Sequence, residues 1–173
     1  MNMDFNWELI KPEKGRRMKN RYYLAYGSNL DMEQMMMRCP GARRRGYGSI
    51  ENYELLYKGS KTGSYLTIEP KAGSHVPVGV FTVTPDDERR LDHYEGFPRF
   101  YYKKEMKIRI WDEVLEKHRK VDAFVYIMHE DRKLGIPSAL YVATCTQGYL
   151  DFGFDLDLLE EAKEKSYAAE RGE

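Results

Sequence analysis

Short apolar runs rich in β-branched and aromatic residues recur along the chain and predict β-strands. The run Val76–Thr84 is almost continuously apolar, which is typical of a strand covered on both faces. The run Lys103–Ile110 alternates instead, as expected of a strand with one exposed face. The predicted strands span 21–26, 47–57, 65–69, 76–84, 103–110 and 121–128. About six or seven strands with few helices between them indicate an α+β fold, a small mixed β-barrel flanked by a few helices.

Helical patterns lie mainly near the end of the chain. Apolar residues at helical spacing predict helices over 138–152 and 155–171. A methionine-rich patch over 31–39 predicts a further short helix. Another helix is expected between Thr84, a favoured N-cap residue, and Gly96, a residue that commonly ends helices. Helices are therefore predicted to flank the strands and to close the chain.

The start of the chain differs from the rest. Residues 1–20 are polar and follow no strand or helix period, which predicts an N-terminal arm, either flexible or partly ordered. Residues 21–153 are predicted to form one domain, and the last segment, 154–173, is expected to be a helix packed on that domain. Because Met18 stands just before the first predicted strand, translation starts at Met1 or at Met18, and the sequence leaves both open.

The balance of charge narrows the classes of partner. The 173 residues include 28 Lys and Arg and 28 Asp and Glu, so the formal net charge is zero. Nucleic-acid binders and polybasic membrane binders need an excess of positive charge, so neither class is expected. No apolar run approaches the roughly 18 residues of a membrane span. Only two cysteines, Cys39 and Cys145, are present, too few for a secreted disulfide framework, so the cytoplasm is the expected location.

The turn after the first predicted strand is a candidate binding site. Gly27 allows the chain to turn and a ligand to approach the backbone closely. Ser28 and Asp31 have the spacing of a helix N-terminal cap. Unpaired N–H groups at such a start bind carboxylates, phosphates or oxyanions. The alternative interpretation is an ordinary strand–turn–helix corner that binds nothing.

Glu95 is the candidate acid/base residue. It falls at the C-terminal end of the helix that Thr84 begins, where the helix dipole disfavours a negative charge. If aromatic neighbours such as Tyr94, Phe97 or Phe100 also desolvate the carboxyl group, its pKa should rise toward neutrality. A carboxyl group with such a pKa suits general acid/base catalysis. The alternative is a solvated surface glutamate.

Three motifs, in order along the chain, carry a resemblance to a known family. They are Tyr26-Gly27-Ser28-Asn29-Leu30, Leu91-Asp92-x-x-Glu95-Gly96 and Pro137-Ser138-Ala139-Leu140-Tyr141. With these motifs, residues 22–153 resemble the γ-glutamylcyclotransferase-like (AIG2-like) family, and residues 97–102 look like its bacterial branch. The resemblance implies a small mixed β-barrel flanked by helices.

The resemblance also implies a reaction and a set of roles. The free α-amine of a small γ-glutamyl substrate attacks its own γ-carbonyl and releases 5-oxoproline and an amine or amino acid, with neither cofactor nor metal. By carry-over from the motifs, Glu95 is the general acid/base residue. The substrate-binding residues implied are Tyr26, Gly27, Ser28, Asn29, Leu30 and Tyr141. The 27–30 segment would bind the substrate carboxylate and the reacting carbonyl through backbone N–H groups, Tyr141 would contribute its hydroxyl, and Tyr26 would pack against the substrate.

Other interpretations stay open at this point. The same fold could serve as a non-catalytic module that binds a small ligand or a partner, or as a related enzyme that removes a γ-glutamyl group from a larger acyl-amine metabolite. Arg99 could reach a second carboxylate on the leaving group or lie on the surface. The leaving amine or amino acid is undetermined, and so is the choice between monomer and homodimer. The four histidines show no metal-ligand spacing: His75, His93, His118 and His129.

Overall fold

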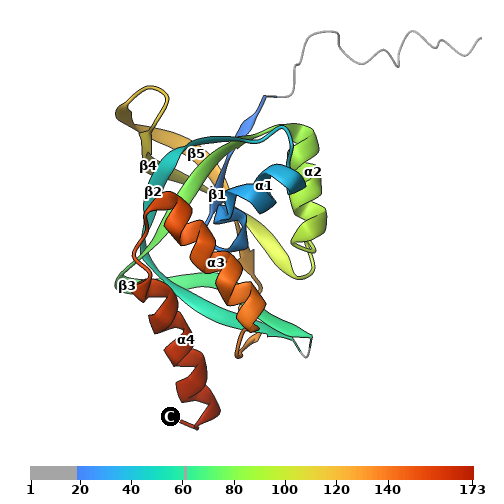
Figure 1. The fold of residues 1–173 in the computed structure, drawn as a ribbon, viewed down its shortest axis with the longest axis vertical. Helices are drawn as coiled ribbons and strands as arrows, with labels where there is room; N and C mark the ends of the chain where they lie inside the picture. The colour runs from blue at the N-terminus through green and yellow to red at the C-terminus, as the bar shows by residue number, and fades with distance from the viewer. Residues whose placement is uncertain (1–18, 61) are drawn as a thin grey trace, which may run out of the picture.

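A computed structural model describes residues 19–60 and 62–173. Most of the predicted N-terminal arm and the alternative start at Met18 lie outside the described residues. Figure 1 shows a barrel-like sheet with helices packed on one side, and the last helix extends away from the barrel to the C-terminus. None of the helices in these two ranges is long and apolar enough to cross a membrane.

Six strands form one mixed sheet in the described part of the chain. They are β1 (Arg21–Ala25), β2 (Arg43–Ser60), β3 (Gly63–Val83), β4 (Tyr101–Asp112), β5 (Lys117–Met128) and β6 (Lys133–Leu134). The strand order is β3-β1-β5-β4-β2-β6, and β3 also pairs with β2, so five strands close into a ring that β6 extends. Only β1 and β5 run parallel. The predicted α+β fold, a small mixed barrel with flanking helices, is confirmed.

One strand is longer than the sequence pattern predicted. The runs 65–69 and 76–83, predicted as parts of two strands, belong to the single strand β3, whose pairing with β2 is interrupted over residues 71–74 and resumes at His75. The pairing shifts register next to Asn52, whose φ is 61°. The Asn52 side chain accepts a hydrogen bond from the Gly73 N–H at 3.1 Å. A bulge therefore carries the hairpin across residues that have neither apolar alternation nor β-branched character.

The helices begin and end close to the predicted positions. They are the 3₁₀ turn η2 (Ser28–Leu30), α1 (Met32–Arg38), α2 (Pro85–Tyr94), α3 (Ala139–Phe152) and α4 (Asp157–Glu170). Thr84 and Asp87 form a reciprocal capping box at the start of α2. The cap predicted for Ser28 is wrong, because Asp31 caps α1 by accepting from the Gln34 N–H, and Ser28 begins η2 instead.

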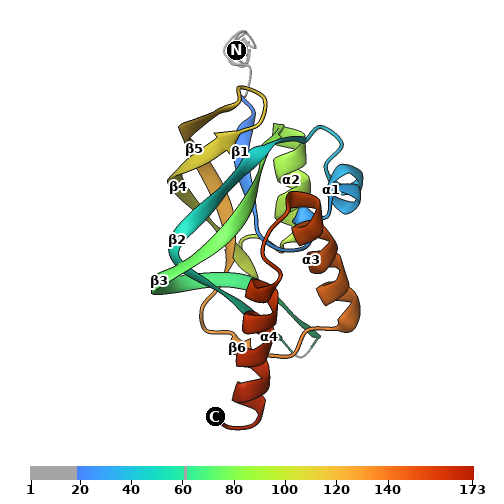
Figure 2. The same ribbon diagram turned by 60° about the vertical axis from the view of Figure 1, so that its left-hand side comes forward.

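Two helices buttress the sheet. Gly148 of α3 lies so close to η2 that an added Cβ would sit 2.5 Å from the Cβ of Leu30. Helix α3 therefore holds the 28–30 turn against the barrel end. Helix α4 lies along β2, where Ser166 donates a hydrogen bond to the Tyr57 carbonyl at 3.4 Å. Figure 2 shows both helices on one side of the barrel, with α4 following α3 toward the C-terminus.

Candidate active site

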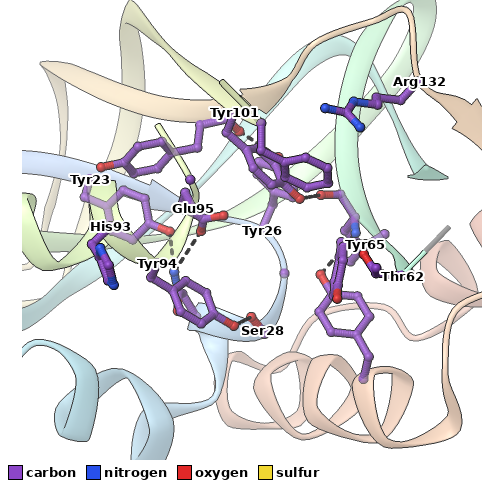
Figure 3. Close-up of a pocket in the computed structure, with 17 residues that line it drawn as sticks. Tyr23, Tyr26, Ser28, Thr62, Tyr65, His93, Tyr94, Glu95, Tyr101 and Arg132 are labelled. Atoms are coloured by element: carbon purple, nitrogen blue, oxygen red, sulfur yellow. Dashed lines mark hydrogen bonds between the residues drawn. The ribbon is translucent and has the colours of Figure 1, made fainter. Parts of the chain in front are cut away.

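A pocket opens where β1 runs into η2 and faces the C-terminal end of α2. Its volume is about 450 Å³. Strands β3 and β5, helix α3 and the segment before β4 complete its walls (Figure 3). The described lining residues are Tyr23, Tyr26, Gly27, Ser28, Asn29, Thr62, Tyr65, Leu66, His93, Tyr94, Glu95, Gly96, Phe100, Tyr101, Tyr126, Arg132 and Tyr141. Seven of these residues are tyrosines, so the wall is aromatic and also carries many hydroxyl groups.

Glu95 lies inside this pocket because α2 ends there. It is the C-cap residue of α2, with its N–H donated to the Leu91 carbonyl at 2.8 Å, and Gly96 follows with a φ of 62°. A left-handed glycine turns the chain away at this point and leaves the Glu95 side chain facing the pocket. In Figure 3 the Glu95 carboxyl group points toward the 27–29 turn.

The Glu95 carboxyl group has an altered pKa. The residue keeps some exposed surface, but its carboxyl group is surrounded by protein atoms, and this burial raises its pKa to about 7. The positive charge of Arg38 lowers the pKa by a smaller amount. The rise was predicted from the sequence, although its main cause is burial. Of the aromatic residues named as neighbours, Tyr94 and Phe100 line the pocket, whereas Phe97 does not.

Asn29 connects Glu95 to a cation that the sequence did not reveal. Its side-chain Nδ2 donates to Glu95 Oε1 at 3.3 Å and to the Tyr23 hydroxyl at 2.9 Å. Its Oδ1 accepts a hydrogen bond from Arg38, whose guanidinium lies 3.3 Å from the centre of the Tyr94 ring. Because Arg38 occupies the oxygen, the amide presents its NH₂ group to the carboxylate. In the sequence, the only indication that Arg38 lies near Asn29 is its position at the end of the short helix that follows Asn29.

Only part of the 27–30 segment lines the pocket that contains Glu95. Ser28 lines the pocket, and its hydroxyl lies 3.3 Å from the Tyr94 hydroxyl. Leu30 was a predicted binding residue, but its side chain is fully buried in the core and its N–H donates to the Gly27 carbonyl at 3.0 Å. Leu30 therefore does not line the pocket. The N–H groups of Ser28 and Asn29, the first of the 3₁₀ turn, have no acceptor within the turn.

Both predicted tyrosines line the pocket, and both are held by backbone hydrogen bonds. The Tyr141 hydroxyl accepts from the Leu66 N–H at 3.0 Å and would lie 3.3 Å from a Cβ added to Gly27. Its own proton is not used in that bond and can be donated, to the neighbouring Cys145 thiol or to a ligand. The Tyr26 hydroxyl donates to the Tyr126 carbonyl at 2.6 Å. Tyr26 thus contributes mainly its ring to the pocket. Arg99 is exposed and does not line the pocket.

Two kinds of catalytic group can be assessed in residues 19–60 and 62–173, a metal cluster and a reactive cysteine. No cluster of three or more His, Cys, Asp or Glu residues within this part of the chain could hold a metal ion. Cys39 and Cys145 are fully buried, and burial raises their thiol pKa values to about 11 and about 12. Thiols with such pKa values stay protonated and are poor nucleophiles.

The family model described as gamma-glutamyl cyclotransferase, AIG2-like, matches residues 23–143. The chain therefore belongs to this family, as the three motifs predicted. A solved structure described as a gamma-glutamyl cyclotransferase superposes with a TM-score of 0.70 and 22% identity over 84% of this chain and 87% of that chain. An uncharacterized Homo sapiens protein superposes with a TM-score of 0.68 and 23% identity over the same shares, 84% and 87%.

A third similar structure is a yeast gamma-glutamyl cyclotransferase specific to glutathione. Its TM-score is 0.57 with 12% identity, over 86% of this chain and 97% of that chain. At these identities the structural likeness shows the shared fold alone. None of the curated proteins matches the sequence.

Proposed function

We propose that this protein is a γ-glutamyl cyclotransferase that converts a small γ-glutamyl compound into 5-oxoproline and an amine or amino acid. The observation that carries the proposal is the Glu95 carboxyl group, which faces a pocket of about 450 Å³ and has a pKa of about 7. A base with that pKa is matched to a proton on an α-amine, whose pKa is about 8.

Glu95 would act twice in the reaction. Its carboxylate first takes a proton from the substrate α-ammonium, and the freed amine attacks the γ-carbonyl carbon to close a five-membered ring. This attack leaves two protons on the ring nitrogen. When the resulting tetrahedral intermediate collapses, Glu95 returns its proton to the leaving nitrogen, and the second proton of the ring nitrogen passes to the departing amine, which leaves as an ammonium ion. The C–N bond to the leaving group breaks, and 5-oxoproline is released with no net proton change at Glu95. Because both reacting groups belong to one molecule, holding the substrate folded supplies much of the rate.

The negative charge of the tetrahedral oxygen needs donors that are already in place. The N–H groups of Ser28 and Asn29 and the Tyr141 hydroxyl would supply them, since all three residues line the pocket. Helix α3 keeps the turn in position through the close packing of Gly148 on Leu30. The Asn29 side chain would fix the orientation of the Glu95 carboxylate through their 3.3 Å hydrogen bond. Tyr26 would pack against the bound glutamyl chain.

A binding module with the same fold is the alternative of another class. Burial of the Glu95 carboxyl group favours the enzyme, because a carboxylate that is hard to ionise weakens the binding of a cationic ligand but suits proton transfer. A related enzyme acting on a larger acyl-amine metabolite would share the chemistry and differ in the leaving group. We propose a small soluble substrate and a cytoplasmic location, and either a monomer or a homodimer fits this function.

The test is the release of 5-oxoproline from a panel of γ-glutamyl amino acids and γ-glutamyl amines. We expect wild-type protein to release product from at least one substrate and Glu95→Gln to lower kcat/KM by about 10²- to 10⁴-fold, the usual contribution of general acid/base catalysis. Glu161→Gln is the matched control, because Glu161 is exposed on α4 and does not line the pocket. No product from any substrate would refute the enzyme, and equal rates in wild type and Glu95→Gln would refute the role of Glu95.

A further inference from the structure

The pocket has a second polar end, away from Glu95. Thr62 between β2 and β3, Tyr65 on β3 and Arg132 between β5 and β6 lie there. In Figure 3 these three residues are on the opposite side of the pocket from Glu95 and Ser28. A substrate whose glutamyl amine lies at Glu95 would therefore direct its other half toward Arg132.

Arg132 is a cation without a carboxylate partner in the structure. Among the described lining residues it is the only Lys or Arg. It is partly buried, and its guanidinium lies 4.7 Å from the centre of the Phe100 ring. No ion pair or side-chain hydrogen bond of Arg132 is found within residues 19–60 and 62–173.

Other partly buried arginines of the barrel do have such partners. Arg44 pairs with Glu113 at 2.9 Å, and Arg45 and Arg119 both pair with Asp112 at 2.9 Å. The nearest acids along the chain do not pair with Arg132. Glu130 accepts a hydrogen bond from the Tyr102 hydroxyl, and Asp131 is exposed and forms no ion pair with Arg132. A guanidinium held against an aromatic ring keeps its N–H groups available in the plane of the fork, which is the geometry that binds a carboxylate.

We propose that Arg132 binds the α-carboxylate of the leaving amino acid, so that the enzyme prefers γ-glutamyl amino acids to γ-glutamyl amines. The inference rests on the proposed function and adds the class of leaving group. The leaving group would lie along a wall of three aromatic rings. The Tyr65 ring makes edge contacts with the rings of Phe100 and Tyr141, with ring centres 6.2 Å and 5.2 Å apart. Arg99, which the sequence offered for this role, is outside the pocket.

The experiment compares two substrates that differ in one charge, γ-glutamylalanine and γ-glutamylalaninamide. We expect wild-type kcat/KM to be about 10- to 100-fold higher for the acid, the range of a charge-assisted hydrogen-bonded pair in a partly buried site. In Arg132→Gln, kcat/KM for the acid should fall by that factor, whereas kcat/KM for the amide should stay within about twofold of wild type. Arg132→Lys should recover part of it, because lysine keeps the charge but not the planar fork. Arg99→Gln is the matched control and should leave the preference unchanged.

Binding to the Glu95→Gln variant separates this inference from the proposed function, because it needs no turnover. Calorimetry with the same two compounds should give a Kd ratio that favours the acid and that disappears in Glu95→Gln/Arg132→Gln. The absence of any product from the wild type overturns the function but leaves the Kd ratio as the test of Arg132. An equal loss for acid and amide in Arg132→Gln would mean that Arg132 serves the glutamyl half or the fold, and it overturns the inference. Equal affinity for the two compounds, or no binding of either, overturns it as well.

Discussion

Two buried carboxyl groups of this barrel have pKa values shifted in opposite directions. Glu95 has a pKa raised to about 7, whereas Asp112, the last residue of β4, has a pKa lowered to about 2. The Asp112 side chain has no exposed surface and forms ion pairs with Arg45 and Arg119. Burial therefore does not by itself decide whether a carboxyl group is charged.

The number of donors around each group makes the difference. Burial alone would raise the pKa of Asp112, but hydrogen bonds from Arg45 and from the N–H groups of Leu115 and Val114 outweigh it. Glu95 receives one side-chain hydrogen bond, from Asn29, at 3.3 Å. Asp112 is thus a permanently charged structural group, while Glu95 can hold or release a proton near neutral pH. Only Glu95 has the property that proton transfer requires.

The largest expected effect is a difference in how much the two substitutions change the stability of the protein. Asp112→Asn removes the charge that two arginines share, and we expect it to lower the free energy of unfolding by about 2–3 kcal/mol at pH 7.5. Glu95→Gln should cause no such loss, because glutamine can still accept the Asn29 hydrogen bond. Urea denaturation measures both values. Folded Asp112→Asn protein should keep its 5-oxoproline-forming activity within about twofold, since the change does not touch the pocket. A large loss of activity in folded Asp112→Asn would contradict the division of roles.

The next effect is the pH dependence of stability. The pKa of Glu95 is about 7 in the folded state and about 4.5 when unfolded, so the folded state binds more protons between these values. The contribution of Glu95 to the free energy of unfolding is fully present below pH 4.5 and is lost as the pH rises through 7. Glu95→Gln should therefore be more stable than wild type by about 2–3 kcal/mol at pH 8 and equal to it near pH 4.5.

Asp112 has the opposite sign and serves as the control for that measurement. Its folded pKa of about 2 lies below the ordinary value of 3.8, so its contribution is present above pH 3.8 and is lost as pH falls toward 2. The difference in free energy of unfolding between wild type and Asp112→Asn should become smaller only in this acidic range. Parallel stability curves for wild type and Glu95→Gln between pH 4.5 and 8 would mean that Glu95 titrates normally.

Local features of the site could be predicted from the sequence. The capping box of Thr84 and Asp87 and the stop at Gly96 depend on neighbours along the chain, so they placed Glu95 at the end of α2 correctly. The same holds for the Ser138 cap that begins α3 three residues before Tyr141. The motifs also identified the family. Short-range hydrogen bonding of this kind is encoded by spacing alone.

The features that could not be predicted depend on barrel closure. Arg132 reaches the pocket from the loop after β5, and Arg38, at the end of α1, contacts the pocket residues Asn29 and Tyr94 from outside it. No local pattern distinguishes these two arginines from Arg99. Leu30 was placed in the site because it stands in the motif, but α3 covers it, as the packing of Gly148 shows. Whether an arginine finds a carboxylate depends on strand register, and register was not predicted.

The smallest expected effect concerns Arg38, whose charge lowers the pKa of Glu95 against the larger effect of burial. Arg38→Met should raise the Glu95 pKa further, because it removes the positive charge that lowers this pKa, and a base with a higher pKa is protonated over more of the pH range. The acidic limb of the pH profile of kcat/KM should then move up by about half a unit to one unit. His93, Arg132 and the pocket tyrosines stay unchanged in this variant and cannot cause the shift.

Arg38→Lys distinguishes charge from orientation in that experiment. Lysine keeps the positive charge but not the planar contact with Asn29 and the Tyr94 ring. If charge sets the pKa, the limb stays near its wild-type position and only kcat changes, because Asn29 is held less firmly. If the limb moves equally in both variants, the orientation of Asn29 controls the pKa of Glu95. An unmoved limb in Arg38→Met would show that Glu95 is insulated from Arg38, so the difference from Asp112 would rest on the hydrogen-bond donors around Asp112 and not on a nearby cation.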